Sequence, residues 1–170
     1  MSSPFYQYAP LYDEWFMKNE KVLLSEVKVV AYFLLKRPIG RALSVGCSSG
    51  LFEMLLKKNC NIEIRECVEP SDMGEIAKKR GLDVKKGYAE SLPYENSTFD
   101  TVLINGVLPY VKDPQKAVNE AYRVLRSSGW VIIAELPAES SYGLLYKSAE
   151  TLGSWDHPYL KRVAQNILIP

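Results

Sequence analysis

The chain has 170 residues, of which 47% are hydrophobic and 24% charged, as expected for one globular domain rather than a disordered segment. Its formal net charge is +1, so no overall positive field favours nucleic acid as a partner. Three cysteines without a C-x-x-C pair argue against a disulfide scaffold and a metal cluster, and they favour a reducing compartment. With no apolar run long enough to cross a bilayer and no signal-peptide pattern, we expect a cytoplasmic protein.

Short β-branched runs alternate with helical patterns along the chain. Apolar residues at helical spacing predict a helix over residues 20–35, which Pro38 stops. A buried strand is predicted at 42–45, followed by a glycine-rich loop at 46–50 and a helix that begins at Leu51.

A second strand is predicted at 62–68, and Ser71 is expected to cap the helix that follows it and closes at Gly81. Residues 84–86 and 101–104 are predicted to form the third and fourth strands.

Asp113 and Pro114 supply an N-cap and a proline at the first helical position of the next helix. Its end is predicted at 127–129, and a fifth strand at 130–135. Its predicted buried face consists of Ala117, Val118, Ala121, Tyr122 and Leu125. Ser140 or Ser141 is expected to cap a last helix.

Five strands separated by four helices predict a three-layer α/β fold, a doubly wound and mostly parallel sheet with right-handed crossovers. Ligands of such sheets bind at the carboxyl ends of the strands, where the strand order reverses. We therefore expect the chemistry just after the predicted first, second, third and fourth strands.

A glycine loop and an acid stand at two of these positions. Gly46 and Gly50 flank Ser48 in a turn that lets a ligand approach the backbone, although many α/β proteins use such a turn only for packing. Glu69 follows the second strand, nineteen positions after Gly50, where a carboxylate can accept both hydroxyls of a ribose. The pattern G-x-G-x-x-G of dinucleotide enzymes lacks its last glycine, which disfavours an NAD-dependent oxidoreductase and favours a nucleoside without pyrophosphate.

Several ordered motifs together resemble the class I S-adenosylmethionine-dependent methyltransferases, in particular the small-molecule branch with the ubiquinone and menaquinone biosynthesis enzymes. The resemblance spans about residues 8–137 and rests on the segments 42–50, 68–71, 87–94, 97–100, 105–110 and 113–129. It implies a Rossmann-like fold, S-adenosylmethionine as cofactor with S-adenosylhomocysteine as product, and a small-molecule methyl acceptor.

The resemblance also implies roles for particular residues. The glycine loop would hold the methionine part of the cofactor, Glu69 the ribose, and the residues after the third strand the adenine. Asn105, at the end of the fourth strand, would lie near the methionine and the substrate. The implied cofactor-binding set is Gly46, Cys47, Ser48, Gly50, Glu69, Pro70, Tyr88, Ala89, Glu90 and Asn105. No catalytic residue is assigned, because methyl transfer depends mainly on alignment and desolvation.

The sequence departs from the family pattern at three positions. Ser44 stands where the first motif carries an acid that orients the loop and the ammonium group of the cofactor. Ser48 replaces the middle glycine, and Tyr88 replaces the aspartate that binds adenine. A catalytically inactive module for cofactor binding or protein interaction is therefore the alternative reading.

The expected organisation is one domain, with a helical cap at 1–40, the cofactor-binding core at 41–137 and a helix and tail at 138–170. The family adds an antiparallel hairpin after the fifth strand, and the residues after 137 are too few for it. We therefore expect either that this end is incomplete or that the fifth strand is an exposed edge, covered by a homo- or hetero-oligomeric partner.

Two further motifs have competing interpretations. The aromatic residues Tyr6, Tyr8, Tyr12, Trp15 and Phe16 could cover the sulfonium or simply pack a first helix. The run from Asn105 to Tyr110 invites comparison with the Asn-Pro-Pro-Tyr motif of amino-group methylases, but three residues separate Asn105 from Pro109, which disfavours it.

Overall fold

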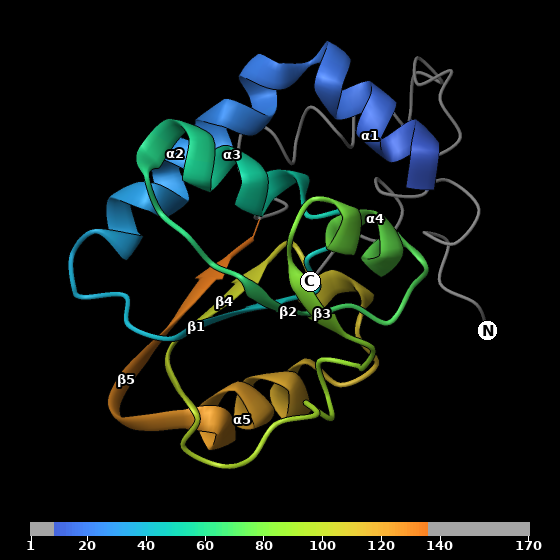
Figure 1. Cartoon of the computed structure of the whole chain (residues 1–170). Helices are drawn as coiled ribbons and strands as arrows, with labels where there is room; N and C mark the ends of the chain where they lie inside the picture. The colour runs from blue at the N-terminus through green and yellow to red at the C-terminus, as the bar shows by residue number, and fades with distance from the viewer. Residues whose placement is uncertain (1–8, 136–170) are drawn as a thin grey trace, which may run out of the picture.

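The computed structural model describes residues 9–135, which form one five-stranded sheet with helices on both faces (Figure 1). The strands are β1 (Ala42–Val45), β2 (Glu66–Val68), β3 (Asp83–Lys85), β4 (Phe99–Asn105) and β5 (Leu125–Ala134). The helices are α1 (Ala9–Lys18), α2 (Glu20–Leu34), α3 (Leu51–Cys60), α4 (Met73–Lys79) and α5 (Pro114–Val124), with a short 3₁₀ turn η2 (Leu108–Tyr110).

The strand order is β3-β2-β1-β4-β5, and all four pairings are parallel. The chain first builds outward from β1 through β2 to β3 and then returns to add β4 on the other side of β1. The order therefore reverses between β1 and β4, and the carboxyl ends of these two strands are where a doubly wound sheet binds its ligand. The sequence prediction of a doubly wound α/β sheet is confirmed.

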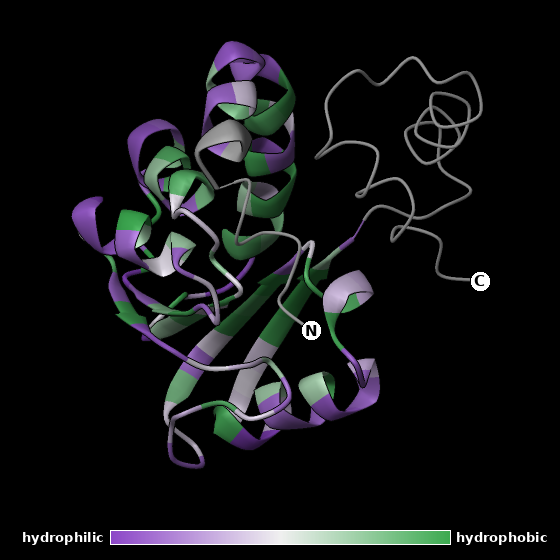
Figure 2. Cartoon of the chain, turned by 90° about the vertical axis from the view of Figure 1, so that its right-hand side faces the viewer, coloured by the Kyte–Doolittle hydropathy of each residue, from purple (hydrophilic) through white to green (hydrophobic). Residues whose placement is uncertain are grey.

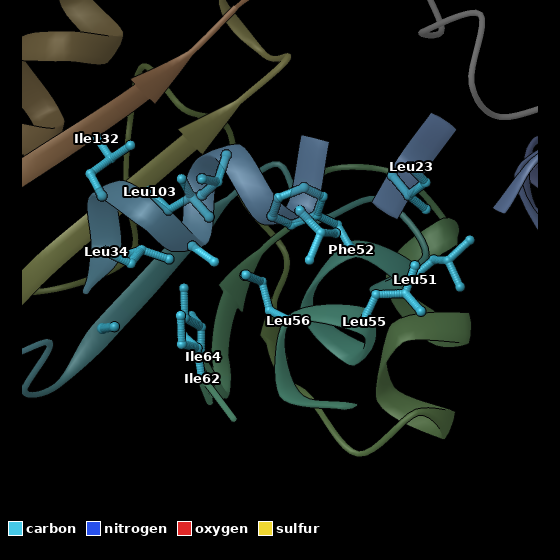
Figure 3. Close-up of a cluster of buried hydrophobic side chains, with 14 residues drawn as sticks. Leu23, Leu34, Leu51, Phe52, Leu55, Leu56, Ile62, Ile64, Leu103 and Ile132 are labelled. Atoms are coloured by element: carbon cyan, nitrogen blue, oxygen red, sulfur yellow. The ribbon is translucent and has the colours of Figure 1, made fainter. Parts of the chain in front are cut away.

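Alternation along β4 divides the core into two layers. Leu103 belongs to the cluster that α2 and α3 cover, whereas Val102 and Ile104 belong to the cluster that α5 covers. Figure 3 shows the first cluster, which includes Leu34 of α2, Leu56 of α3 and Leu103 of β4. Hydrophobic residues are concentrated in the strands, and the outward surfaces of the helices are largely hydrophilic (Figure 2).

The transition from α5 to β5 differs from the prediction. The helix ends at Val124 and β5 begins at Leu125, because Thr98 N–H donates to Val124 O (2.7 Å) and Leu125 pairs with Phe99. Tyr122, predicted to be buried, is 81% exposed. Hydrogen bonds to the start of β4 thus end the helix earlier than the Ser127–Gly129 signal indicates.

Other boundaries move by smaller amounts. The extended segment from residue 62 pairs as β2 only from Glu66, because its partner β1 has just four residues, although Ile62 and Ile64 are buried. On α2, Phe33 was predicted to face the core but is 51% exposed, while Ala31 is buried. The Ser71 hydroxyl accepts from Met73 N–H (3.3 Å) at the start of α4, near its expected capping position.

The last predicted helix, and the region in which we expect the hairpin to be incomplete, lie outside the described residues. Within residues 9–135, β5 is an edge strand, so its pairing with a partner stays a prediction. In the same range, no helix has the length and apolar character needed to cross a bilayer.

Candidate functional site

The glycine loop turns back over the end of the neighbouring strand. Gly46 and Gly50 have φ values of +72° and +74°, and Gly46 N–H donates to Val68 O (2.7 Å). Ser48, at the position where the family pattern has a glycine, adopts the same left-handed region with φ +54°. The serine therefore accepts the conformation that the loop requires, at the modest strain that a non-glycine residue has there.

Gly46→Ala is expected to lower the free energy of unfolding by about 1–3 kcal/mol. A Cβ at this position would lie 2.6 Å from Val107 Cγ2, in addition to the positive φ. Gly81→Ala is the matched control, because Gly81 has φ +89° and nothing within 4 Å of the same Cβ. Urea unfolding of both variants measures the difference, and equal losses would show that the contact with Val107 imposes no restriction.

Glu69 joins the loop after β1 to the turn after β2. The residue is 7% exposed, and its carboxylate Oε2 accepts from Ser48 N–H at 2.8 Å. Oε1 accepts from the backbone N–H of Ser71 at 2.9 Å and from the Ser71 hydroxyl at 2.5 Å. The structure thus brings together the two motifs that the sequence singled out, with the acid fixed against the loop.

A second buried carboxyl, which the sequence analysis missed, lies beside the end of β1. Glu53, in the first turn of α3, is 4% exposed, and its Oε1 accepts from the Ser44 hydroxyl at 2.6 Å. Burial raises the pKa of Glu53 to about 7, with a smaller contribution from the charge of Glu69 and opposing effects from hydrogen bonds. A carboxyl group therefore lies beside Ser44, but it belongs to Glu53 of α3 and not to a residue of β1.

Arg80 connects the same loop to the first helix. Its guanidinium donates to Ser49 O at 2.8 Å and to Asp13 Oδ2 at 2.6 Å. Asp13 belongs to α1, so this arginine joins three segments that are far apart in the sequence.

Buried polar atoms without a partner gather around the glycine loop. Among the described residues, five buried side-chain atoms lack a hydrogen bond, and three of them are Asp13 Oδ1, Ser49 Oγ and Glu53 Oε2. Ser49 is in the loop, while Asp13 and Glu53 are joined to it or to the preceding strand through Arg80 and Ser44. Leaving such atoms unpaired costs about 1–3 kcal/mol each, so this region is suited to a polar ligand that supplies partners.

The remaining predicted residues divide into those at the carboxyl edge and those whose side chains turn into the core. Asn105 ends β4 half-buried, and Tyr88 is 64% exposed after β3. Glu90 accepts from Lys112 N–H at 2.8 Å and so ties two loops together. In contrast, Ala89 packs in the cluster under α5, so only its backbone is available to a ligand.

Cys47 contributes no reactive thiol. It is 5% exposed, and a hydrogen bond with Cys67 together with burial raises its pKa well above the usual range. Of the N-terminal aromatics, Phe16 packs on the cluster under α2 and α3. The rings of Trp15 and Phe16 lie edge to face, with their centroids 4.9 Å apart. Tyr6, Tyr8 and the side chain of Tyr12 lie outside the described residues, so the proposed cover over a sulfonium stays a prediction.

Glu135, just after β5, has a structural role next to Asn105. Its Oε1 accepts from the N–H groups of Val107 (3.1 Å) and Leu108 (3.0 Å), where η2 begins. Burial raises its pKa, against the effect of these two bonds. Within the described range, no three His, Cys, Asp or Glu side chains are grouped to hold a metal ion.

Sequence comparison identifies a protein family and several relatives of this chain. Residues 43–133 match the family model described as a methyltransferase domain. An uncharacterized protein of Methanocaldococcus jannaschii is 34% identical over 143 residues, covering 84% of this chain and 66% of that protein. A ubiquinone/menaquinone biosynthesis C-methyltransferase of Ruegeria is 37% identical over 82 residues, covering 48% of this chain and 31% of the enzyme.

Among solved structures, a SAM-dependent methyltransferase from Thermotoga maritima has a TM-score of 0.76 and 32% identity. The alignment covers 96% of this chain and 78% of that one. A second structure, from Methanococcus maripaludis, has a TM-score of 0.67 at 20% identity and shows the fold alone. The chain thus spans at most two-thirds of the length of the two curated relatives described above.

Proposed function

Because this chain belongs to the S-adenosylmethionine-dependent methyltransferase family, we propose that it transfers the methyl group of that cofactor to a small-molecule acceptor. The observation that carries the proposal is the carboxylate of Glu69, buried at the end of β2 and held against the backbone of the glycine loop. An acid in this position suits the two hydroxyls of a ribose.

The hydrogen bonds of Glu69 suggest how it would receive a ribose. A carboxylate offers about four acceptor positions, and three donors already occupy this one. Of these donors, only the Ser71 hydroxyl is able to rotate away, since the other two are backbone N–H groups. We expect a ribose hydroxyl to replace the Ser71 hydroxyl and a second one to take the remaining position.

Other residues are proposed to surround the rest of the cofactor. The backbone of Gly46, Cys47, Ser48 and Gly50 would face the methionine part, and Asn105 would lie beside it at the end of β4. Pro70, Tyr88, Ala89 and Glu90 would lie around the adenine, with Tyr88 covering the base.

Glu53 is proposed to provide the negative charge that Ser44 lacks. Its Oε2 is buried without a partner, and its Oε1 is fixed by the Ser44 hydroxyl, so the carboxyl has one oxygen left for a cationic group. The ammonium group of the cofactor is the matching charge. With it bound, the ionised form of Glu53 would be favoured, which compensates for the burial of the carboxyl.

When bound, the cofactor would supply a methyl group on a sulfonium, for transfer to an acceptor nucleophile with S-adenosylhomocysteine as the leaving product. The chain would contribute alignment: Glu69 would hold the ribose, the glycine loop and Glu53 would hold the methionine part, and the edge near Asn105 would lie toward the acceptor. Such a reaction needs no dedicated acid or base when both partners are aligned and shielded from water.

Titration calorimetry tests the proposal. We expect the purified chain to bind S-adenosylmethionine and S-adenosylhomocysteine at one site and NAD not at all. Binding followed by methyl transfer to a quinol or another small acceptor would support the enzyme, whereas binding without turnover on any acceptor would favour the inactive module. Failure to bind either sulfur compound would contradict the proposal, and selective binding of NAD would point to an oxidoreductase.

We also propose a location and an oligomeric contact for this chain. The three cysteines are all free, which suits a reducing cytoplasm. A second subunit on the edge of β5 is proposed as the oligomeric contact, and sedimentation of the purified chain would test it.

A further inference from the structure

The bridge made by Arg80 is unusual among the ion pairs of this chain. The side chains of Arg80 and Asp13 are 19% and 13% exposed. In every other ion pair among the described residues, at least one of the two side chains is 30% exposed or more. Removing such charges from water carries a desolvation penalty, which only good geometry and further hydrogen bonds offset. Here the guanidinium gains a second bond, to the carbonyl of Ser49.

That second bond acts on the glycine loop itself. The carbonyl of Ser49 belongs to the same peptide unit as the N–H of Gly50, which donates to Cys47 O at 2.9 Å. Holding this carbonyl therefore fixes the orientation of the last peptide of the loop, directly before α3 begins at Leu51.

The ion pair with Arg80 and the packing of Phe16 together hold α1 in place. Asp13 and Phe16 are three positions apart on α1 and so share one face of the helix. Phe16 packs on the hydrophobic cluster under α2 and α3, while Asp13 reaches Arg80 at the end of α4. Figure 1 shows α1 on the same side of the sheet as α2, α3 and α4.

Both groups that Arg80 binds retain an unpaired polar atom. Asp13 Oδ1 and Ser49 Oγ are buried without a hydrogen bond. A purely structural clamp has no reason to retain such costs, but they are offset when a polar ligand binds nearby.

We propose that Arg80 is a positioning residue that couples the docking of α1 to the conformation of the glycine loop, which makes α1 part of the cofactor site. The inference rests on the proposed function for the identity of the ligand, S-adenosylmethionine. Since coupling is reciprocal, the ligand stabilises the docked α1 by the same factor by which docking strengthens binding.

The test combines calorimetry and hydrogen exchange on the full chain. Arg80→Gln and Asp13→Asn are each expected to weaken S-adenosylmethionine binding about tenfold, and the double variant no further, because both break one linkage. Asp13→Glu, which keeps the charge, should recover part of the affinity. In the wild type the cofactor should protect the amides of residues 13–18 from exchange, and in Arg80→Gln this protection should be lost.

Arg41→Gln is the matched control, because Arg41 forms a 2.6 Å ion pair with Glu66 at the opposite, amino end of the sheet. It should leave affinity and protection unchanged. Additive losses from Asp13→Asn and Arg80→Gln, or full protection of 13–18 in Arg80→Gln, would overturn the coupling.

Failure of the proposed function has a different signature. If the wild type does not bind the cofactor, exchange without ligand still decides the coupling. If Arg80→Gln speeds the exchange of the backbone amides in both residues 13–18 and residues 46–50, the coupling is supported. If only one of the two segments exchanges faster, the coupling is refuted.

Discussion

Glu69→Ala is expected to weaken S-adenosylmethionine binding about 100-fold or more. Two ribose hydroxyls donating to a carboxylate are charge-assisted bonds, each contributing about 1.5–3 kcal/mol, and both are lost. Calorimetry measures the change directly. Glu66→Gln is the matched control, because Glu66 begins the strand that Glu69 follows and pairs with Arg41 at the amino end of the sheet.

The same substitution also affects folding, so the two effects need to be separated. Without the carboxylate, the backbone N–H groups of Ser48 and Ser71 lose their acceptor, at a cost of about 1–3 kcal/mol each if they stay buried. Glu69→Gln keeps one oxygen and the shape of the side chain, and so should remain better folded while binding weakly. Wild-type affinity in folded Glu69→Gln and Glu69→Ala would exclude Glu69 as the ribose ligand.

Glu53→Gln is expected to stabilise the fold at pH 8 and to weaken the binding of S-adenosylmethionine. Burial raises the pKa of Glu53 to about 7 from an ordinary value of 4.5, so between these pH values the folded chain retains a proton that the unfolded chain has lost. The contribution of this group to the free energy of unfolding therefore falls as pH rises from 4.5 to 7. Above pH 7 the full penalty is present, on the order of 3 kcal/mol.

Urea unfolding of wild type and Glu53→Gln across pH 4.5 to 8 checks the sign. The two should be nearly equal at the acid end, and the variant should be the more stable one at pH 8. A variant that is less stable at every pH would indicate that Glu53 is a structural hydrogen-bond partner of Ser44 alone.

The binding arm separates function from stability. S-adenosylmethionine should bind the wild type more tightly above pH 7, where Glu53 ionises, and this pH dependence should disappear in Glu53→Gln. Adding Ser44→Asp to that variant returns an acid to β1 and should restore affinity. Unchanged binding in Glu53→Gln would remove Glu53 from the cofactor site.

The family and the fold class were accessible from the sequence, because both depend on short-range order along the chain, and the same local signals indicated the candidate site. A β-branched run, a glycine turn and a helix in direct succession specify the β1–loop–α3 unit, and Glu69 follows the next strand at the expected offset. The contact between Glu69 and Ser48 follows from parallel pairing, which aligns the ends of β1 and β2 at one edge. The local signals could not predict that α5 ends at Val124, because bonds to the start of β4 determine it.

Only the tertiary structure decided which further side chains meet at this edge. Glu53 and Ser44 are nine residues apart, and nothing in the spacing indicates that the first turn of α3 points a carboxyl at the end of β1. Asp13 and Arg80 are 67 residues apart and join through the packing of α1. The sequence by itself therefore determined the order of strands, loops and helices and the glycine loop of the candidate site, since these rest on local periodicity and turn chemistry. Tertiary packing determined which charged side chains are buried at the candidate site and with which groups they pair, because both depend on neighbours that are distant along the chain.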